Sequence, residues 1–131
     1  MTVRIVRLGS ERLPREGLRI GSVRRPPRGV PKSEYGKRNI YDVWLPGLAP
    51  SEPLLKEAQK AVSNADERAW RAFVRKYRAE MKATENRTLL DTLAALSHSA
   101  DFSLGCYCAD EERCHRSVLR DLLVERGAQL G

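Results

Sequence analysis

A short apolar segment near the C-terminus, flanked by two segments of helical periodicity, constrains the fold more than any other feature of this sequence. Residues 102–108 are apolar or small, and the run is too short for a helix, as is typical of a strand buried on both faces. Leucines recur at helical spacing before it, over 89–96, and apolar residues do so after it, over 118–123. A strand between two helices indicates an α/β domain.

The N-terminal half contains two further candidate strands. Residues 3–8 and 18–23 interleave apolar side chains with charged or small ones. The second strand runs into a basic loop, residues 24–29, where Pro26 and Pro27 lack the N–H groups that a sheet needs. Residues 41–45 fit either a strand or a short helical turn.

Helical patterns dominate from the middle of the chain onward. Ser51 and Asn86 are candidate N-caps of the first and third helices, and Asn64 with Glu67 resembles a capping box for the second. Gly127 follows the last helix, at the position where a left-handed residue ends many helices. For 131 residues we expect a single compact α/β domain covering the whole chain, in which helices flank a small, largely parallel sheet.

The positive charge of the chain is confined to its first fifty residues. The formal net charge is +7, and these fifty residues hold eleven Lys or Arg against four Asp or Glu, whereas the rest holds thirteen of each. The excess is densest between Arg19 and Arg38, a segment that includes the basic loop. The loop arginines are Arg24, Arg25 and Arg28. Such a cluster attracts phosphate groups of nucleotides or nucleic acids, although a solvated basic loop without a ligand is the simpler alternative.

The sequence contains no segment suited to a membrane. No stretch approaches the roughly 20 apolar residues that cross a bilayer, and the N-terminus lacks the apolar block of a signal peptide. We therefore expect a cytoplasmic protein with reduced thiols and no membrane partner.

All three cysteines and one of the two histidines lie within ten residues of one another. Cys106 and Cys108 end the buried strand, and Cys114 and His115 precede the last helix. In an open parallel sheet, sites form outside the carboxyl ends of the strands, where loops lead into helix N-termini. This group is therefore the leading candidate site, and the alternative is that the cysteines are small buried residues without a chemical role.

Three familiar cysteine chemistries fit the spacing poorly. Zinc needs four converging ligands, but Cys114 and His115 are adjacent and would diverge by about 100 degrees on a helix. A cysteine phosphatase needs an arginine at a fixed distance after its cysteine, and no cysteine here has one at that distance. Thiol exchange between Cys106 and Cys114 lacks a Cys-x-x-Cys motif. We therefore expect no metal or cofactor, with zinc and redox chemistry as the remaining alternatives.

An anion site at the head of the last helix fits the residues better. Free backbone N–H groups and the helix dipole attract an anion there, and Arg116 and Ser117 add side-chain donors. The same field lowers the pKa of Cys114, which makes it a candidate nucleophile with His115 as proton carrier. We predict that Cys114 and His115 are catalytic and that Cys106, Arg116 and Ser117 contact the ligand.

Four motifs along the chain carry a family resemblance. They are Arg25-Pro26-Pro27-Arg28-Gly29-Val30 with Lys32; Trp44-Leu45 followed by Leu48-Ala49-Pro50-Ser51; Trp70, Phe73, Tyr77, Arg78 and Glu80; and Leu104-Gly105-Cys106 followed after seven residues by Cys114-His115-Arg116-Ser117. Together they resemble a bacterial and archaeal family catalogued as domain of unknown function 488, over nearly the whole chain. The resemblance implies an α/β fold and assigns no activity. Cys108 stands where the branch with the Cys-His-Arg triplet usually has glutamate.

These observations predict a pocket at one edge of the sheet. Arg24, Arg25 and Arg28 of the basic loop would face the Cys-His-Arg helix head across it. We expect the pocket to bind a phosphate-bearing ligand, a nucleotide or a nucleic-acid end, and to process it through Cys114 and His115. The main alternative is a non-enzymatic nucleic-acid-binding module with an extended basic face and strongly salt-dependent affinity, followed by a metal-stabilised scaffold.

Overall fold

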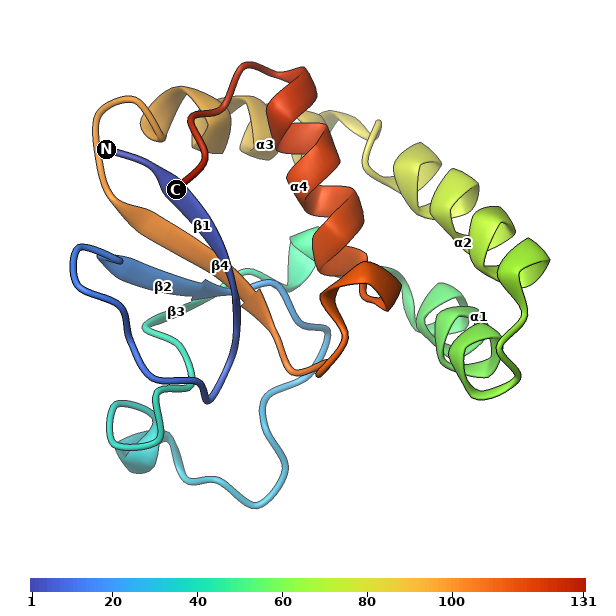
Figure 1. Ribbon diagram of the computed structural model, residues 1–131, viewed down its shortest axis with the longest axis horizontal. Helices are drawn as coiled ribbons and strands as arrows, with labels where there is room; N and C mark the ends of the chain where they lie inside the picture. Colours follow the sequence, from blue (N-terminus) through green and yellow to red (C-terminus); the bar gives the residue numbers. More distant parts are fainter.

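The computed structural model describes residues 1–131 and contains one four-stranded sheet (Figure 1). The strands are β1 (Val3–Arg7), β2 (Leu18–Gly21), β3 (Val43–Trp44) and β4 (Phe102–Cys106). Their order across the sheet is β1-β4-β2-β3, and every neighbouring pair is parallel. The predicted α/β fold with a small parallel sheet is confirmed, and residues 41–45 contribute the edge strand β3.

Strand β4 lies inside the sheet because its residues tolerate burial on both faces. All five of them are buried. Gly105 matters for this packing, because a Cβ atom added there would lie 2.5 Å from the Leu8 side chain. The missing side chain lets the residue that follows β1 pack directly against β4.

The chain contains four helices: α1 (Glu52–Ser63), α2 (Glu67–Glu80), α3 (Thr84–Leu96) and α4 (His115–Glu125). Helices α1 and α2 pack against each other at one end of the molecule, while α4 contacts α2, α3 and strand β4 (Figure 1). Short 3₁₀ turns occupy three connections: η1 (Lys32–Glu34), η2 (Pro46–Leu48) and η3 (Glu111–Arg113). None of the helices combines the length and apolar character needed to cross a membrane.

The predicted N-terminus of α2 is wrong by two residues. The cap is Asp66 instead of Asn64, and its carboxylate accepts a hydrogen bond from the Ala69 N–H at 3.0 Å. Ala65 has a φ of +48°, and this left-handed residue turns the chain so that Asp66 reaches the cap position. The capping chemistry is the expected one, but it is supplied by a different residue.

The other predicted helix ends divide into one error and two agreements. Asn86 does not cap α3, because it lies inside that helix and donates its side-chain N–H to the Glu80 carbonyl at 3.1 Å. Ser51 occupies the N-cap position of α1, as predicted, but its side chain makes no capping hydrogen bond. Gly127 has a φ of +81°, in agreement with the predicted left-handed residue after α4.

Two apolar clusters form the interior. The larger one joins the sheet to all four helices and includes Leu104 of β4 and Leu119 of α4. The smaller one lies at the carboxyl ends of the strands and includes Leu8, Cys106 and Cys114. Two of the three cysteines are therefore part of a small, separate core beside the candidate site.

A buried ion pair holds the chain around the start of β2. Arg19 and Glu16 are 0% and 2% exposed, and the guanidinium donates twice to the carboxylate, at 2.7 and 2.8 Å. Its remaining terminal nitrogen donates to the carbonyls of Ser10 and Asn39, and Ser103 of β4 donates to Glu16. Arg19, counted above in the basic segment, therefore adds no charge to the surface.

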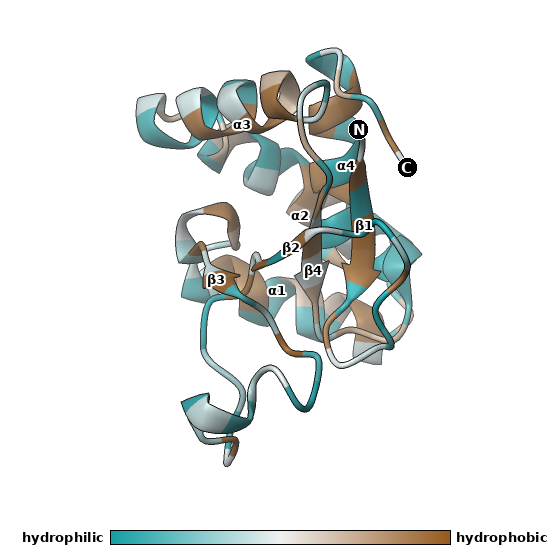
Figure 2. Ribbon diagram, turned by 90° about the vertical axis from the view of Figure 1, so that its left-hand side faces the viewer, coloured by the Kyte–Doolittle hydropathy of each residue, from teal (hydrophilic) through white to brown (hydrophobic).

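The two ends of the chain meet beside β1, as Figure 1 shows. The Val3 N–H donates to the Gln129 carbonyl and the Gly131 N–H donates to the Val3 carbonyl, both at 2.9 Å. The segment that carries η1 instead projects away from the sheet and is largely hydrophilic (Figure 2). The candidate site lies at neither place, but at the edge where β2 and β4 end.

Candidate functional site

The site begins where β2 and β4 end side by side. Gly21 of β2 pairs with Gly105 of β4, so Ser22, which follows β2, and Cys106, the last residue of β4, come next to each other at this edge. The Ser22 N–H and hydroxyl both donate to the Gly105 carbonyl, at 2.9 and 3.0 Å. This contact fixes the Ser22 backbone beside the cysteine, at the edge where the sequence places the site.

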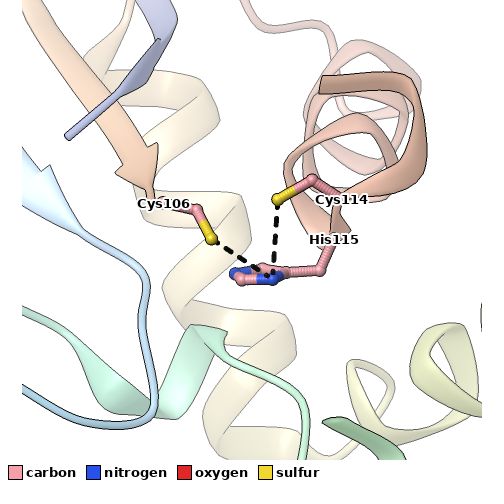
Figure 3. Close-up of side chains that lie close together, drawn as sticks. All are labelled: Cys106, Cys114 and His115. Carbon is pink, nitrogen blue, oxygen red and sulfur yellow. Dashed lines mark hydrogen bonds between the residues drawn. The ribbon is translucent and has the colours of Figure 1, made fainter. Parts of the chain in front are cut away.

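Three reactive side chains converge at this edge (Figure 3). The ligand-forming atoms of Cys106, Cys114 and His115 all lie within 4.8 Å of one another, and all three residues are buried. His115 Nδ1 lies 3.9 Å from the Cys106 sulfur and 4.0 Å from the Cys114 sulfur. Cys108 adds a third sulfur, 3.7 Å from that of Cys106. We call these four residues the Cys/His cluster.

The expectation that Cys114 and His115 diverge is wrong. Cys114 is the N-cap residue of α4 and has extended backbone angles, φ −133° and ψ 151°, so it is not yet helical. His115 is the first residue of the helix. The angle of about 100 degrees between adjacent residues applies only when both are helical, and here the two side chains converge.

The hydrogen bonds of His115 identify its neutral tautomer. Nε2 lies 2.6 Å from the Ser22 carbonyl oxygen, which can only accept, so Nε2 carries the proton. In the neutral ring, Nδ1 therefore presents a lone pair, and it faces two sulfurs. The ring is held from one side by the edge of the Tyr77 ring, with centroids 5.8 Å apart.

The thiols of the cluster differ in acidity. Hydrogen bonds with the Cys108 and Cys114 thiols, together with burial, raise the pKa of Cys106. Hydrogen bonds with the Cys106 and Cys108 thiols, and contact with His115, lower the pKa of Cys114. The lowered pKa agrees with the sequence prediction, but its main cause is the neighbouring thiols, which the sequence reasoning left out.

Arg116 and Ser117 donate hydrogen bonds to backbone carbonyls of the cluster. The Arg116 guanidinium donates to the Cys108 carbonyl at 2.7 Å, and the Ser117 hydroxyl donates to the Cys114 carbonyl at 2.9 Å. Neither residue lines the cavities described below. Arg116 is 3% exposed, has no acidic partner, and leaves its Nε atom without a hydrogen bond. Their predicted contact with a ligand remains a prediction, and the structure gives both side chains partners within the chain.

The structure contains a cavity at the predicted place, but Cys114 and Arg116, which were also expected to face it, do not line it. A cavity of about 460 Å³ is lined by the basic loop on one side, including Arg24, Arg25 and Arg28, and by Cys106 and His115 on the other. The strand ends bring the two sides together, because the basic loop follows β2 and the cluster follows β4. Residues about eighty positions apart in the sequence thus share one cavity, as the sequence analysis expects.

The three loop arginines have different partners. Arg24 donates to the backbone carbonyls of Ala49 and Pro50 at 2.9 and 3.0 Å. Arg25 forms an exposed ion pair with Glu52. Arg28 makes no hydrogen bond or ion pair within the chain. Arg28 is therefore the loop guanidinium most available to an incoming anion.

A second cavity, of about 450 Å³, adjoins the first. It lies between α1, α2 and the turn before α4, and it is lined by Trp70, Phe73 and Cys114 among other residues. The two cavities share Leu55, Gln59, Cys108 and His115. The Cys/His cluster thus lies at the junction of a basic cavity and a largely apolar one.

The walls from α1 and α2 are missing from the sequence prediction, which names Trp70 and Phe73 only for the family resemblance. Both side chains are buried, and both also line the second cavity. The sequence contains one sign of this wall. Leu55, Gln59 and Val62 follow one another at helical spacing on α1, beside the core stripe of that helix.

The family comparison covers nearly the whole chain. A family model described as DUF488-N3a, active DUF488-N3 subclade, matches residues 3–127. No curated protein and no solved structure matches the chain. The match includes every element that forms the two cavities and the cluster.

Proposed function

The chain belongs to the DUF488-N3a family, the active DUF488-N3 subclade, and on that premise we propose that it binds a phosphate-bearing ligand, a nucleotide or a nucleic-acid end. One observation carries the proposal: the arginines of the basic loop line the same cavity as Cys106, Cys108 and His115. Its volume of about 460 Å³ is in the range of small-molecule sites. The description of the subclade as active is consistent with a retained site.

The three loop arginines differ in how freely they can contact a phosphate. Arg28 has no partner within the chain and supplies a forked pair of donors to a phosphate. Arg24 is held by two backbone carbonyls and contributes its charge from a fixed position. Arg25 can exchange its exposed partner Glu52 for a ligand at little cost, because exposed ion pairs contribute about 0–1 kcal/mol.

The adjoining cavity favours a ligand with an apolar, flat part next to its phosphate. Trp70 and Phe73 lie among its walls, and nucleobases commonly pack against aromatic side chains. Gln59 lines both cavities and can donate to or accept from such a ligand at the junction. This combination supports a nucleotide over inorganic phosphate.

The charges of the segment from Arg19 to Arg38 support a local pocket over an extended nucleic-acid face. Arg19 is buried with Glu16. Arg25 and Arg38 pair with acidic side chains, and Arg24 is bonded to carbonyls. Of the seven Lys and Arg residues in this segment, Arg19 and Arg24 are therefore held within the fold, and Arg25 and Arg38 would have to give up an acidic partner to bind a long polyanion.

Of the two predicted catalytic residues, His115 lines the basic cavity and Cys114 does not. A phosphate at Arg28 would share its cavity with Cys106 and His115. Cys114 lines only the second cavity and is 2% exposed. The proposal is therefore one of binding, and it assigns no nucleophile.

Calorimetric titration tests the proposal. Phosphate, a nucleoside monophosphate and a 5′-phosphorylated oligonucleotide are compared with the same oligonucleotide lacking its phosphate. We expect Arg28→Ala to weaken phosphate-dependent binding by about tenfold or more, because a charge-assisted hydrogen bond contributes about 1.5–3 kcal/mol.

Lys37→Ala is the matched control, because Lys37 is exposed, comes from the same basic segment and lines neither cavity. It should leave the affinity within about twofold, since an exposed charge outside the site is largely screened. Equal losses in both variants, with a steep dependence on salt, would instead support the extended basic face. Absence of binding by any phosphate compound would refute the proposal.

A further inference from the structure

We infer that Cys106, Cys108, Cys114 and His115 are the ligands of one tetrahedral Zn²⁺ ion. The inference is independent of the proposed anion binding, which uses the arginines on the opposite wall of the cavity. It begins with the donor set: three thiols and an imidazole from two adjoining segments, the end of β4 and the start of α4. Mixed sulfur and nitrogen ligands in this number select zinc over hard cations such as Mg²⁺ or Ca²⁺.

The distances among the donor atoms are close to those of such a centre. Tetrahedral zinc with bonds of about 2.3 Å to sulfur and about 2.0 Å to nitrogen spaces two sulfurs about 3.8 Å apart and a sulfur and a nitrogen about 3.6 Å apart. The Cys106 and Cys108 sulfurs are 3.7 Å apart. His115 Nδ1 lies 3.9 and 4.0 Å from the Cys106 and Cys114 sulfurs. Three of the donors lie within 4.8 Å of one another, and the exposed side chain of Cys108 would turn toward Cys114 and His115 to complete the geometry.

The imidazole is already oriented as a metal ligand. Ligating histidines usually donate their second ring N–H to a carbonyl or carboxylate, which fixes the tautomer. His115 donates Nε2–H to the Ser22 carbonyl at 2.6 Å, and its unprotonated Nδ1 faces the sulfurs.

Arg116 supplies an independent argument. Its guanidinium is 3% exposed, it has no acidic partner in the structure, and Nε is unbonded. A buried cation without a counter-charge is strongly unfavourable. A centre of Zn²⁺, three thiolates and a neutral imidazole has one net negative charge, and Arg116 donates directly to the carbonyl of one ligand, Cys108. The buried cation then has its counter-charge.

Metal analysis and cobalt substitution test the inference. Protein purified under reducing conditions should contain about one zinc per chain, measured by mass spectrometry of the metal. Replacement by Co²⁺ should give the visible spectrum of a tetrahedral site with sulfur-to-cobalt charge transfer. In Cys108→Ser the charge-transfer absorbance per cobalt should fall by about a third, because two thiolates remain of three. Cys108 is exposed, so this variant should fold normally.

His98→Ala and His115→Ala form a matched pair. Both imidazoles bond a backbone carbonyl through Nε2, but only His115 faces thiols. His115→Ala should weaken zinc binding by at least about tenfold in a chelator competition, whereas His98→Ala should leave it unchanged.

Three results would overturn the assignment. They are metal-free protein that takes up neither Zn²⁺ nor Co²⁺ after reduction, a disulfide within the cluster in protein isolated under reducing conditions, and a cobalt spectrum unaffected by Cys108→Ser. None of these results depends on phosphate binding, and loss of phosphate binding in Arg28→Ala would leave the metal content unchanged.

Discussion

Two buried arginines, Arg19 and Arg116, differ in the partners that their guanidinium groups have within the chain. The guanidinium of Arg19 donates to the Glu16 carboxylate and to two backbone carbonyls, so its charge and all its nitrogens have partners. The guanidinium of Arg116 has one carbonyl partner and no counter-charge. The first arrangement is complete within the chain. The second lacks a negative counter-charge, which the proposed zinc centre would supply. We therefore assign Arg19 to the framework of the fold and Arg116 to the site.

Removing the carboxylate partner of Arg19 should lower the free energy of unfolding more than the other substitutions proposed below. Glu16→Ala leaves a buried guanidinium without its carboxylate, and we expect the free energy of unfolding to fall by about 3–5 kcal/mol. Urea denaturation followed by circular dichroism measures the loss. Lys76→Ala, which removes an exposed partner of Glu57, should cost less than about 1 kcal/mol. Similar losses in both variants would show that Arg19 and Glu16 are not a structural unit.

Replacing Arg116 should have a smaller effect on metal-free protein. Arg116→Met removes one hydrogen bond but also an unpaired buried charge, so the free energy of unfolding should change by less than about 1 kcal/mol. The same variant should weaken zinc binding by about tenfold, because the negative centre loses its counter-charge. Denaturation and chelator competition give the two values. A loss as large as that of Glu16→Ala would place Arg116 in the framework.

Lowering the pH should gradually remove the stability that the ion pair between Arg19 and Glu16 contributes. Burial alone would raise the pKa of Glu16, but hydrogen bonds from Arg19, the Leu13 N–H and Ser103 lower it below its ordinary value of 4.5. A carboxyl with a lowered pKa stabilises the fold above pH 4.5, and this contribution is lost as the pH falls through the folded value.

Denaturation at several pH values checks this effect. The wild-type chain should lose more stability than Glu16→Gln between about pH 5 and about pH 3. Glu16→Gln keeps most of the volume and one acceptor, so it should fold. Parallel curves for the two proteins would mean that Glu16 does not titrate as expected.

The fold was predictable because its pattern is local. The apolar run at 102–108 between two helical patterns indicates a buried strand, and its first five residues form β4, whereas Cys108 lies beyond the strand and is exposed. The shared cavity was also predictable, because loops that follow parallel strands meet at one edge. Arg24, Arg25 and Arg28 could therefore be placed opposite Cys106 and His115.

The details of the site depend on backbone angles and on distant partners, which a pattern does not contain. The convergence of Cys114 and His115 follows from the extended backbone of one residue at the helix boundary. The burial of Arg19 depends on Glu16, Ser10 and Asn39, and no count of charges distinguishes a paired arginine from a free one.

The meeting of the two chain ends beside β1 also affects how molecules of this protein associate. β1 is an outer strand, and exposed outer strands can pair with a strand of another chain and so promote aggregation. Here Leu130 pairs with Val3, and residues 129 and 131 share hydrogen bonds with the same strand. The opposite outer strand, β3, has two residues. The C-terminal segment thus covers the start of β1 at Val3, and both outer edges of the sheet are short, which limits intermolecular strand addition.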